Sequence, residues 1–250
     1  MKKVVLITGV LGGIGRATAK LFQKNGWYVV GVDLGEILPD LTEVDLFIQA
    51  DVSDTLAWEN IAHQLSGKVQ NIVAIVNNAA IQVCKPLVET TPEEWDRVMA
   101  VNVRSVYLGV RQLYPFMKSQ GGAIVNVSSV HAIATSANIA AYAASKGAML
   151  ALTRALAIEL ASDQIRVNAV LPGAVDTPML HSGLSRGHLQ ADNVLELVEQ
   201  LGSKHVIGRV GQPEEIAEAI YFLADNSRSS FMTGQLLVVD GGATCRLSTE

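Results

Sequence analysis

The sequence has little cysteine, no basic block and no long uninterrupted apolar run. Cys84 and Cys245 are its two cysteines, too few for a disulfide framework or for a four-cysteine metal site. We therefore expect a reducing, cytoplasmic location and no bound metal. No apolar run reaches about 18 residues, so no membrane span is expected. The formal net charge of −5 carries no polybasic segment, which gives a nucleic-acid partner no support.

What the sequence does have is enough apolar residues for one large core. Its 250 residues are 49% hydrophobic and 17% charged, which fits a domain whose central strands are covered on both faces. We expect a single domain over residues 1–250.

Short β-branched runs alternate with longer helical patterns along the chain. The runs are continuously apolar, as in a parallel sheet with helices on both faces. This pattern predicts an α/β, doubly wound parallel sheet, the Rossmann fold. The expected strands are Val4 to Ile7, Tyr28 to Val32, Ile72 to Val76, Ala123 to Val127, Ile165 to Leu171 and Leu236 to Val239, with a further apolar stretch at Leu46 to Ala50. The expected helices are Gly13 to Lys24, Asp54 to Leu65, Pro92 to Lys118, Asn138 to Ala161 and Pro213 to Leu223.

Between Pro172 and Gly211 the periodicity fades, and Gly, Ser and His accumulate. A long irregular segment after the carboxyl end of a strand is where an open α/β sheet carries a substrate lid. We expect that lid at residues 176–206, with glycines as hinges and apolar side chains to cover a ligand.

A glycine-rich turn follows the first strand and opens the first helix. Glycines there allow a sharp turn, close approach to a pyrophosphate, and free helix N–H groups aimed at its charge. The spacing of these glycines satisfies both G-x-x-x-G-x-G and G-x-x-G-x-x-G, so it does not identify a subfamily of dinucleotide-binding proteins. The residues expected to bind a dinucleotide in this turn are Gly9, Gly13, Ile14 and Gly15.

Asp33 closes the second strand, where a carboxylate accepts hydrogen bonds from the adenosine ribose and repels a 2′-phosphate. No Lys or Arg stands at Val10, Leu11 or Leu34 to offset that repulsion, so NAD is favoured over NADP. Asp51 and Val52 follow the next apolar stretch and are expected at the adenine edge. A helix N-cap role is an equally good interpretation of Asp51.

Tyr142 and Lys146 are four residues apart, which on a helix places both side chains on one face. A tyrosine acting as a base near pH 7 needs its pKa lowered by roughly 3 units, or about 4 kcal/mol. One positive charge about 4 Å away, at an effective dielectric of about 20, supplies around that much. Tyr142 with Lys146 therefore forms a candidate general acid/base.

These motifs together resemble the short-chain dehydrogenase/reductase family, in its compact single-domain form. Ala80 stands where that family usually has glycine. The matching residues are Thr8 to Gly15, Asn77 to Ala80, Asn102, Ser129, Tyr142 with Lys146, Pro172-Gly173 and Asp240 to Gly242.

The resemblance implies a division of catalytic labour. Ser129, 13 residues before Tyr142, would hydrogen-bond the substrate oxygen, which selects it over Ser128. Tyr142 would exchange the proton, and Lys146 would bind the nicotinamide ribose and lower the tyrosine pKa. Asn102 would support a proton relay through Lys146.

The resemblance also implies further contacts to cofactor and substrate. Asn78 would line the cofactor cleft, and Val175 and Thr177 would touch the carboxamide end. A simple turn explains Pro172-Gly173 equally well. The candidates for substrate contact are Gln82, Cys84, Val130, His131, Leu180 and His181, of which Gln82, Ser129, His131 and Leu180 are the main set.

The expected activity is hydride transfer between NAD and a secondary alcohol or ketone. Gln82 and His131 resemble the carboxylate contacts of hydroxybutyrate dehydrogenases, but Ile139 stands where those enzymes carry a lysine. A hydroxyacid dehydrogenase or 3-ketoacyl reductase is therefore the alternative enzyme. Outside enzymes, the alternative is an NAD(H)-sensing regulator, which would not need the complete catalytic set. For His131, a purely structural role stays open.

We also expect a homotetramer. The helices that begin near Pro92 and Asn138 carry small apolar residues on more than one face, which favours burial on both sides. The family resemblance places a four-helix contact between subunits there. Burial within one subunit is the alternative.

Overall fold

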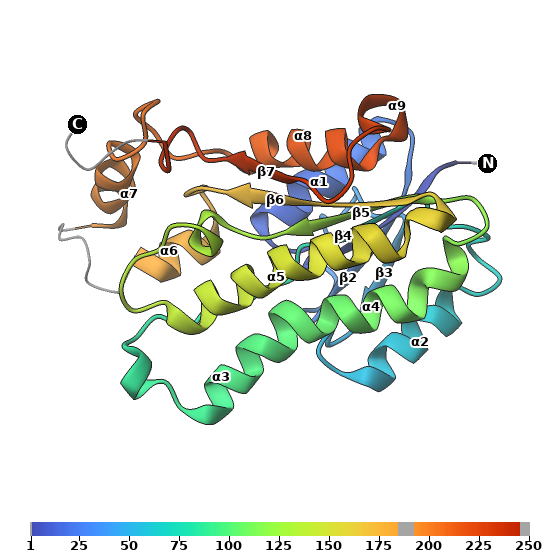
Figure 1. Ribbon diagram of the computed structural model, residues 1–250, viewed down its shortest axis with the longest axis horizontal. Helices are drawn as coiled ribbons and strands as arrows, with labels where there is room; N and C mark the ends of the chain where they lie inside the picture. The colour runs from blue at the N-terminus through green and yellow to red at the C-terminus, as the bar shows by residue number, and fades with distance from the viewer. Residues whose placement is uncertain (1, 185–192, 246–250) are drawn as a thin grey trace.

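The computed structural model describes residues 2–184 and 193–245. This part of the chain folds around a seven-stranded parallel sheet with helices on both faces (Figure 1). The predicted doubly wound fold is therefore confirmed, and each expected strand agrees to within two residues. The strands are β1 (Val4–Thr8), β2 (Tyr28–Asp33), β3 (Leu46–Gln49), β4 (Ala74–Asn77), β5 (Gly122–Val127), β6 (Ile165–Pro172) and β7 (Leu236–Val239).

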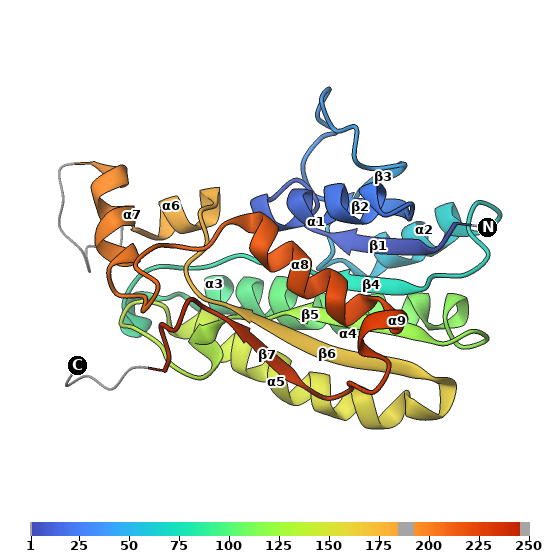
Figure 2. The same cartoon turned by 90° about the horizontal axis from the view of Figure 1, so that it is seen from above.

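The strand order is β3-β2-β1-β4-β5-β6-β7, which Figure 2 shows from above. β1 pairs with β2 on one side and with β4 on the other, so the winding reverses between β1 and β4. Ligands of open α/β sheets bind beyond the carboxyl ends of the strands at such a point. β1, β4 and β6 are buried along their whole length, which explains their continuously apolar sequences.

Two helical layers cover the sheet (Figure 1). The helices α1 (Gly13–Lys24), α8 (Pro213–Ala224) and α9 (Asn226–Ser229) lie on one face, and α2 (Thr55–Leu65), α3 (Pro92–Met99), α4 (Ser105–Leu113) and α5 (Ala140–Glu159) on the other. The side chains of Phe22 and Ile220 fill the first layer, and those of Trp58 and Ile61 the second. None of the helices in the described residues is long and apolar enough to cross a membrane.

The structure divides the single helix predicted from Pro92 to Lys118. α3 begins at a capping box formed by Thr91 and Glu94, and a π-helical turn at Ala100–Arg104 separates it from α4. A 3-10 turn at Tyr114–Phe116 ends the run. Apolar periodicity does not detect a π turn, because one extra residue shifts the register without interrupting the apolar pattern. The turn contains Asn102, one of the predicted catalytic residues.

The segment from Pro172 to Gly211, predicted to be irregular, contains two helices among its described residues. They are α6 (Pro178–Leu184) and α7 (Val194–Gly202), which lie beyond the carboxyl ends of the strands (Figure 1). α6 is too short for a periodic signal. Asn193 caps α7 by accepting a hydrogen bond from Glu196 N–H. Residues 185–192 of the predicted lid lie outside the described residues.

Candidate active site

The glycine turn after β1 forms a tight cradle. Gly9 has φ +67°, and Asn78 Nδ2 donates to the carbonyl oxygens of Thr8 and Gly9 at 3.0 Å each. A Cβ at Gly15 would lie 2.1 Å from the Gly9 carbonyl oxygen, and one at Gly13 would lie 2.8 Å from Thr177 Cγ2. α1 has neither a side-chain N-cap nor an acidic residue in its first turn. The residues present therefore fit a pyrophosphate, which would meet N–H groups and no competing anion.

Asp33 lies against this cradle at the end of β2. Its carboxylate accepts hydrogen bonds from Leu11 N–H at 2.9 Å and from Gly35 N–H at 3.1 Å. Asp33 is thereby held beside the glycine turn, where an adenosine ribose would lie if a dinucleotide occupied the cradle. Arg16, the nearest arginine in sequence, forms ion pairs with Glu43 at 2.5 Å and with Asp40 at 2.7 Å.

Asp51 follows β3 and is not the N-cap of α2. That cap is Asp54, whose carboxylate accepts from Leu56 N–H at 3.1 Å. Asp51 instead accepts from Ser53 N–H and Ser53 Oγ at 2.9 and 2.7 Å, and closes a three-residue turn that includes Val52. The N-cap interpretation is wrong because α2 begins at Thr55, one residue after Asp54.

Tyr142 and Lys146 lie one turn apart on α5, as their spacing predicted, and both are buried. Lys146 Nζ lies 5.5 Å from the centre of the Tyr142 ring and donates to the Val127 carbonyl oxygen at 2.7 Å. Burial lowers the pKa of Lys146 from 10.5 to about 8. Below that pH Lys146 carries a positive charge beside the Tyr142 ring.

Ser128 and Ser129 have different surroundings at the end of β5. Ser128 Oγ donates to the Lys146 carbonyl oxygen at 2.9 Å, so Ser128 fixes α5 to the strand. Ser129 Oγ accepts a hydrogen bond from His131 N–H at 3.1 Å, and its hydroxyl proton remains available for a second partner. The choice of Ser129 over Ser128, which the family resemblance implied, stays a prediction.

Asn102 connects three parts of the site. Its Oδ1 accepts from Ile81 N–H at 2.8 Å, and its Nδ2 donates to the Ile81 carbonyl oxygen and to Ser145 Oγ, each at 2.9 Å. Ser145 Oγ donates in turn to the Tyr142 carbonyl oxygen at 2.7 Å. The Asn102 side chain thus holds the segment after β4 against α5. Ser145 was missed in the sequence, although it lies inside the motif between Tyr142 and Lys146.

His131 contacts the tyrosine directly. Its ring meets the Tyr142 ring edge to face, with the ring centres 6.0 Å apart, and its Nδ1 hydrogen-bonds Thr135 Oγ1 at 3.0 Å. The second main substrate candidate, Gln82, donates from Nε2 to the Met179 carbonyl oxygen at 2.7 Å. Gln82 therefore links the segment after β4 to α6.

The residues after β6 surround the other side of the cradle. Thr177 Oγ1 accepts from Leu180 N–H at 3.2 Å and donates to the Val175 carbonyl oxygen at 3.2 Å, which orients the start of α6. His181 Nε2 hydrogen-bonds Asp176 Oδ1 at 2.7 Å, so its ring is engaged within its own segment. Cys84 and Val130, the remaining candidates, are half-buried.

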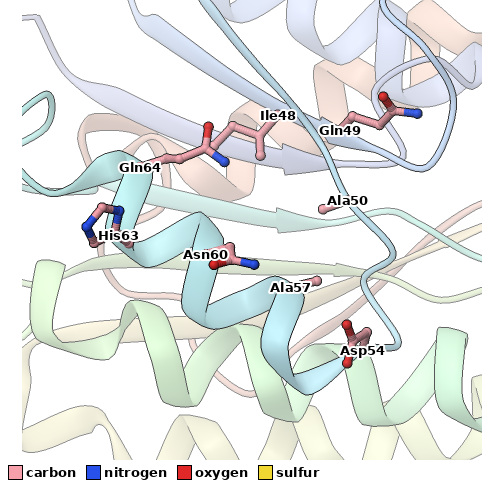
Figure 3. Close-up of a pocket in the computed structure, with 8 residues that line it drawn as sticks. All are labelled: Ile48, Gln49, Ala50, Asp54, Ala57, Asn60, His63 and Gln64. Carbon is pink, nitrogen blue, oxygen red and sulfur yellow. The ribbon is translucent and has the colours of Figure 1, made fainter.

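A pocket of about 280 Å³ lies elsewhere, between edge strand β3 and α2 (Figure 3). Gln49, Asn60, His63 and Gln64 give it a polar lining, and no residue of the predicted catalytic set lines it. It is distinct from the cradle and the α5 cluster.

The glycine cradle, Asp33 and the buried tyrosine and lysine define a dinucleotide-dependent oxidoreductase of the Rossmann type. A family model described as Enoyl-(Acyl carrier protein) reductase matches residues 9–244. Cyclopentanol dehydrogenase of Comamonas sp. is 37% identical over 251 residues, which cover 97% of each chain. The chain belongs to the short-chain dehydrogenase/reductase family, as its motifs predicted.

Solved structures agree with this assignment. The ligand-free aldohexose dehydrogenase of Thermoplasma acidophilum has a TM-score of 0.91 at 32% identity, covering 99% of this chain and 96% of that one. The 3-ketoacyl-(acyl-carrier-protein) reductase of Brucella melitensis, solved with NADH, has a TM-score of 0.87 at 35% identity, covering 97% and 98%. The predicted class of enzyme, an alcohol dehydrogenase or ketoreductase with a nicotinamide cofactor, is confirmed.

Proposed function

We propose that the protein is an NAD(H)-dependent dehydrogenase of small secondary alcohols, with Tyr142 as general acid/base. The observation that carries the proposal is the buried cluster at the end of β5, where Lys146 is held beside Tyr142 by the Val127 carbonyl oxygen. The hydride acceptor of the reaction is the nicotinamide, when bound. Gly9, Gly13, Ile14, Gly15, Asp33, Asp51, Val52, Asn78, Tyr142, Lys146, Val175 and Thr177 are the residues proposed to hold the cofactor.

The four proposed catalytic residues divide the proton chemistry. Ser129 Oγ donates to the substrate oxygen and orients it. Tyr142 accepts the hydroxyl proton during oxidation and returns it during reduction, so no free alkoxide forms. Lys146, charged below a pKa of about 8, stabilises the phenolate. Asn102 keeps the segment at Ile81 and the Tyr142 turn of α5 in register.

The preference for NAD rests on Asp33. Its carboxylate is fixed by Leu11 N–H beside the cradle, and Arg16 is occupied by two acidic partners, so a 2′-phosphate would meet a negative charge without a cation.

A small cyclic alcohol is the substrate class we favour. Relatives of this chain include a cyclopentanol dehydrogenase and a cis-4-hydroxycyclohexanecarboxylate dehydrogenase of Sinomonas cyclohexanicum, 35% identical. His131, packed against Tyr142, and Gln82, held by α6, are proposed to flank the substrate with Leu180. The alternative of a ketoacyl reductase is favoured by the 37% identity to the 3-oxoacyl-[acyl-carrier-protein] reductase of Thermotoga maritima. The hydroxyacid alternative is disfavoured by Ile139, which is buried and brings no cation.

Turnover tests this proposal. The purified protein is assayed with NAD⁺ and NADP⁺ against cyclopentanol, cyclohexanol derivatives, 2,3-butanediol and 3-hydroxybutyrate, and with NADH and NADPH against a 3-ketoacyl thioester. We expect the highest kcat/KM with NAD⁺ and a cyclic alcohol. Tyr142→Phe should lose more than about 99% of kcat, because a general acid/base contributes roughly 10²–10⁴-fold, and should keep its NADH affinity.

Two results would contradict the proposal. A Tyr142→Phe variant that kept a tenth of kcat would remove Tyr142 from the acid/base role. Binding of NADH without turnover of any alcohol or ketone would favour the regulator.

We further propose that α6 and α7, in the described residues 176–184 and 193–206, belong to the substrate lid predicted at residues 176–206. Gln82 donates a hydrogen bond to the Met179 carbonyl oxygen of α6, so a movement of α6 on closure would also move or break this contact with the segment after β4. Hydrogen exchange should show more protection of α6 with NADH and a substrate analogue than without them. Equal protection would contradict a lid.

A homotetramer is proposed from the outer surface of α4 and α5. These helices lie side by side on the outside of the molecule (Figure 1), and Tyr107 and Ile158 are exposed there, Ile158 by 79%. Large exposed apolar side chains beside small ones favour a helical contact between subunits. Light scattering should give four times the chain mass, and the mass of one chain would refute the tetramer. The low number of cysteines, two in 250 residues, favours the proposed cytoplasmic location.

A further inference from the structure

The turn at Asp51–Ser53 borders the adenosine side of the cradle. Ala50 N–H, which directly precedes the turn, donates to the Asp33 carbonyl oxygen at 2.7 Å. Asp33 in turn accepts from Leu11 N–H of the glycine turn. The turn therefore sits next to the residue proposed to bind the adenosine ribose.

Two arginines from the α3 and π-turn region donate hydrogen bonds to this turn. Arg97 Nη1 donates to Ser53 Oγ at 2.5 Å, and Arg97 Nη2 donates to Asp51 Oδ2 at 3.0 Å. Arg104 Nη2 donates to the Ser53 carbonyl oxygen. Two guanidinium groups thus fix the carboxylate of Asp51 and both the hydroxyl and the backbone carbonyl of Ser53, the first and last residues of the turn.

Both arginines come from the run that contains the π-helical turn. Arg97 lies in the last turn of α3 and Arg104 ends the π turn, with Asn102 between them. Asn102 contacts Ile81 and Ser145, toward the catalytic end. One short stretch of backbone therefore holds the Asp51–Ser53 turn on one side and supports the catalytic cluster on the other.

Fold stability alone does not explain this arrangement. The side chains of Arg97 and Asp51 are 43% and 33% exposed, and ion pairs at such sites contribute little, about 0–1 kcal/mol, because water and salt screen them. A guanidinium group does fix orientation, because its planar N–H donors hold the groups that accept from them in one geometry. The group oriented here is the carboxylate of Asp51.

We propose that Arg97 and Arg104 are positioning residues for the adenine end of the cofactor, acting through the Asp51–Ser53 turn. The inference rests on the proposed NAD(H) function. With the turn fixed, the Asp51 carboxylate would accept a hydrogen bond from the exocyclic amine of the adenine when the cofactor is bound. Without the arginines, the turn keeps its internal hydrogen bonds and the bond from Trp58 Nε1 to the Val52 carbonyl oxygen at 2.8 Å. The Asp51 carboxylate and the Ser53 hydroxyl then lose the guanidinium that orients them, and part of the binding energy of the adenosine half is lost in ordering these side chains.

The test separates the two halves of the dinucleotide. Binding of NADH, ADP-ribose and reduced nicotinamide mononucleotide is measured for wild type and Arg97→Met by nicotinamide fluorescence and competition. NADH and ADP-ribose should bind about 3–10-fold more weakly to the variant, the loss expected for one hydrogen bond. The mononucleotide, which lacks adenosine, should bind equally to both. In turnover, KM for NAD⁺ should rise by the same factor, with kcat within about twofold.

Matched variants check the cause. Ser53→Ala removes the hydroxyl that Arg97 contacts and should show the same selectivity, so the proposal stays testable if Arg97→Met folds poorly. Arg97→Lys should recover part of the affinity, because a lysine restores the charge without the planar N–H donors. Arg228→Met removes a comparably exposed arginine of α9, which pairs with Asp225 at 3.5 Å. α9 lies on the other face of the sheet, near the start of β6 (Figure 1), so this variant should leave all three affinities unchanged.

Equal weakening of all three ligands would overturn the proposal, because it would indicate general damage to the site. Unchanged binding of NADH and ADP-ribose to Arg97→Met would also overturn it. Failure of the proposed function gives a different result, seen in the wild type itself. The wild type would then bind neither NADH nor ADP-ribose, or would bind NADH without turnover of any alcohol or ketone.

Discussion

Replacement of Lys146 by methionine should make the cofactor-free protein more stable near pH 7 while it abolishes catalysis. Lys146 is 2% exposed, and burial lowers its pKa to about 8. At pH 7 the native protein therefore carries a desolvated ammonium. Methionine has a similar length and no charge, so it fills the same space without that cost.

The depressed pKa sets the magnitude. A change from 10.5 to about 8 corresponds to about 3 kcal/mol of destabilisation whenever Lys146 is charged. The variant also loses the hydrogen bond to the Val127 carbonyl oxygen, worth about 1 kcal/mol. Lys146→Met should therefore stabilise the protein by about 2 kcal/mol at pH 7, which for a chain of this size raises Tm by roughly 4–8 °C.

The pH dependence has a definite sign. Between pH 8 and 10.5 the unfolded chain binds a proton at Lys146 that the native chain has released, so wild-type stability rises with pH in this window. The advantage of the variant should shrink by about 1.4 kcal/mol per pH unit in this window and reverse near pH 9.5. By about pH 10.5 only the lost hydrogen bond remains, and the variant should then be the less stable chain.

Thermal unfolding followed by circular dichroism, without cofactor and at fixed protein concentration, measures the difference from pH 7 to 10.5. Both chains should carry Tyr142→Phe, which removes ionisation of the neighbouring phenol, and all other titrations cancel. A Tm difference that does not change with pH, or a variant less stable than its parent at pH 7, would refute the reasoning.

Three further predictions concern the cofactor and the substrate. Asp33→Ala combined with Leu34→Arg should move the NADH/NADPH affinity ratio toward NADPH by at least about 10-fold, because it removes a repulsive charge and adds a phosphate partner at an exposed position; fluorescence titration with both dinucleotides measures the ratio, and an unchanged ratio contradicts the role of Asp33. Gly15→Ala should weaken NADH binding more than about 10-fold and lower stability by about 1–3 kcal/mol, because its Cβ would lie 2.1 Å from the Gly9 carbonyl oxygen. Its control, Gly147→Ala, meets no atom within 4 Å and should stabilise α5 by up to about 1 kcal/mol; equal effects at both glycines would remove the cradle argument. His131→Ala should raise KM more for substrates with a second polar group than for simple secondary alcohols, because only the former lose a hydrogen bond. An equal rise in steady-state kinetics for both would return His131 to a structural role against Tyr142.

The extent to which the sequence predicted the site depended on how local each signal was. Tyr142 and Lys146 share a helix, so their four-residue spacing alone placed them together. Asp33 and the glycines end successive parallel strands, so their meeting at one edge followed from the strand pattern. The choice of Ser129 over Ser128 needed the spacing known for the family, and it stays a prediction.

Apolar periodicity and short spacings are local properties of the chain, so they were enough to predict the parallel sheet, the bounds of its strands and the proximity of Tyr142 and Lys146. The acid/base role of that pair stays a prediction. Only the tertiary structure decided the rest. The hydrogen bond from Arg97 to Ser53 joins residues 44 positions apart, and the bond from Gln82 to Met179 in α6 joins residues 97 positions apart. The π turn at Asn102 shifts the helical register by one residue. No local pattern encodes such contacts, since each forms only when two separately specified elements pack against the same sheet.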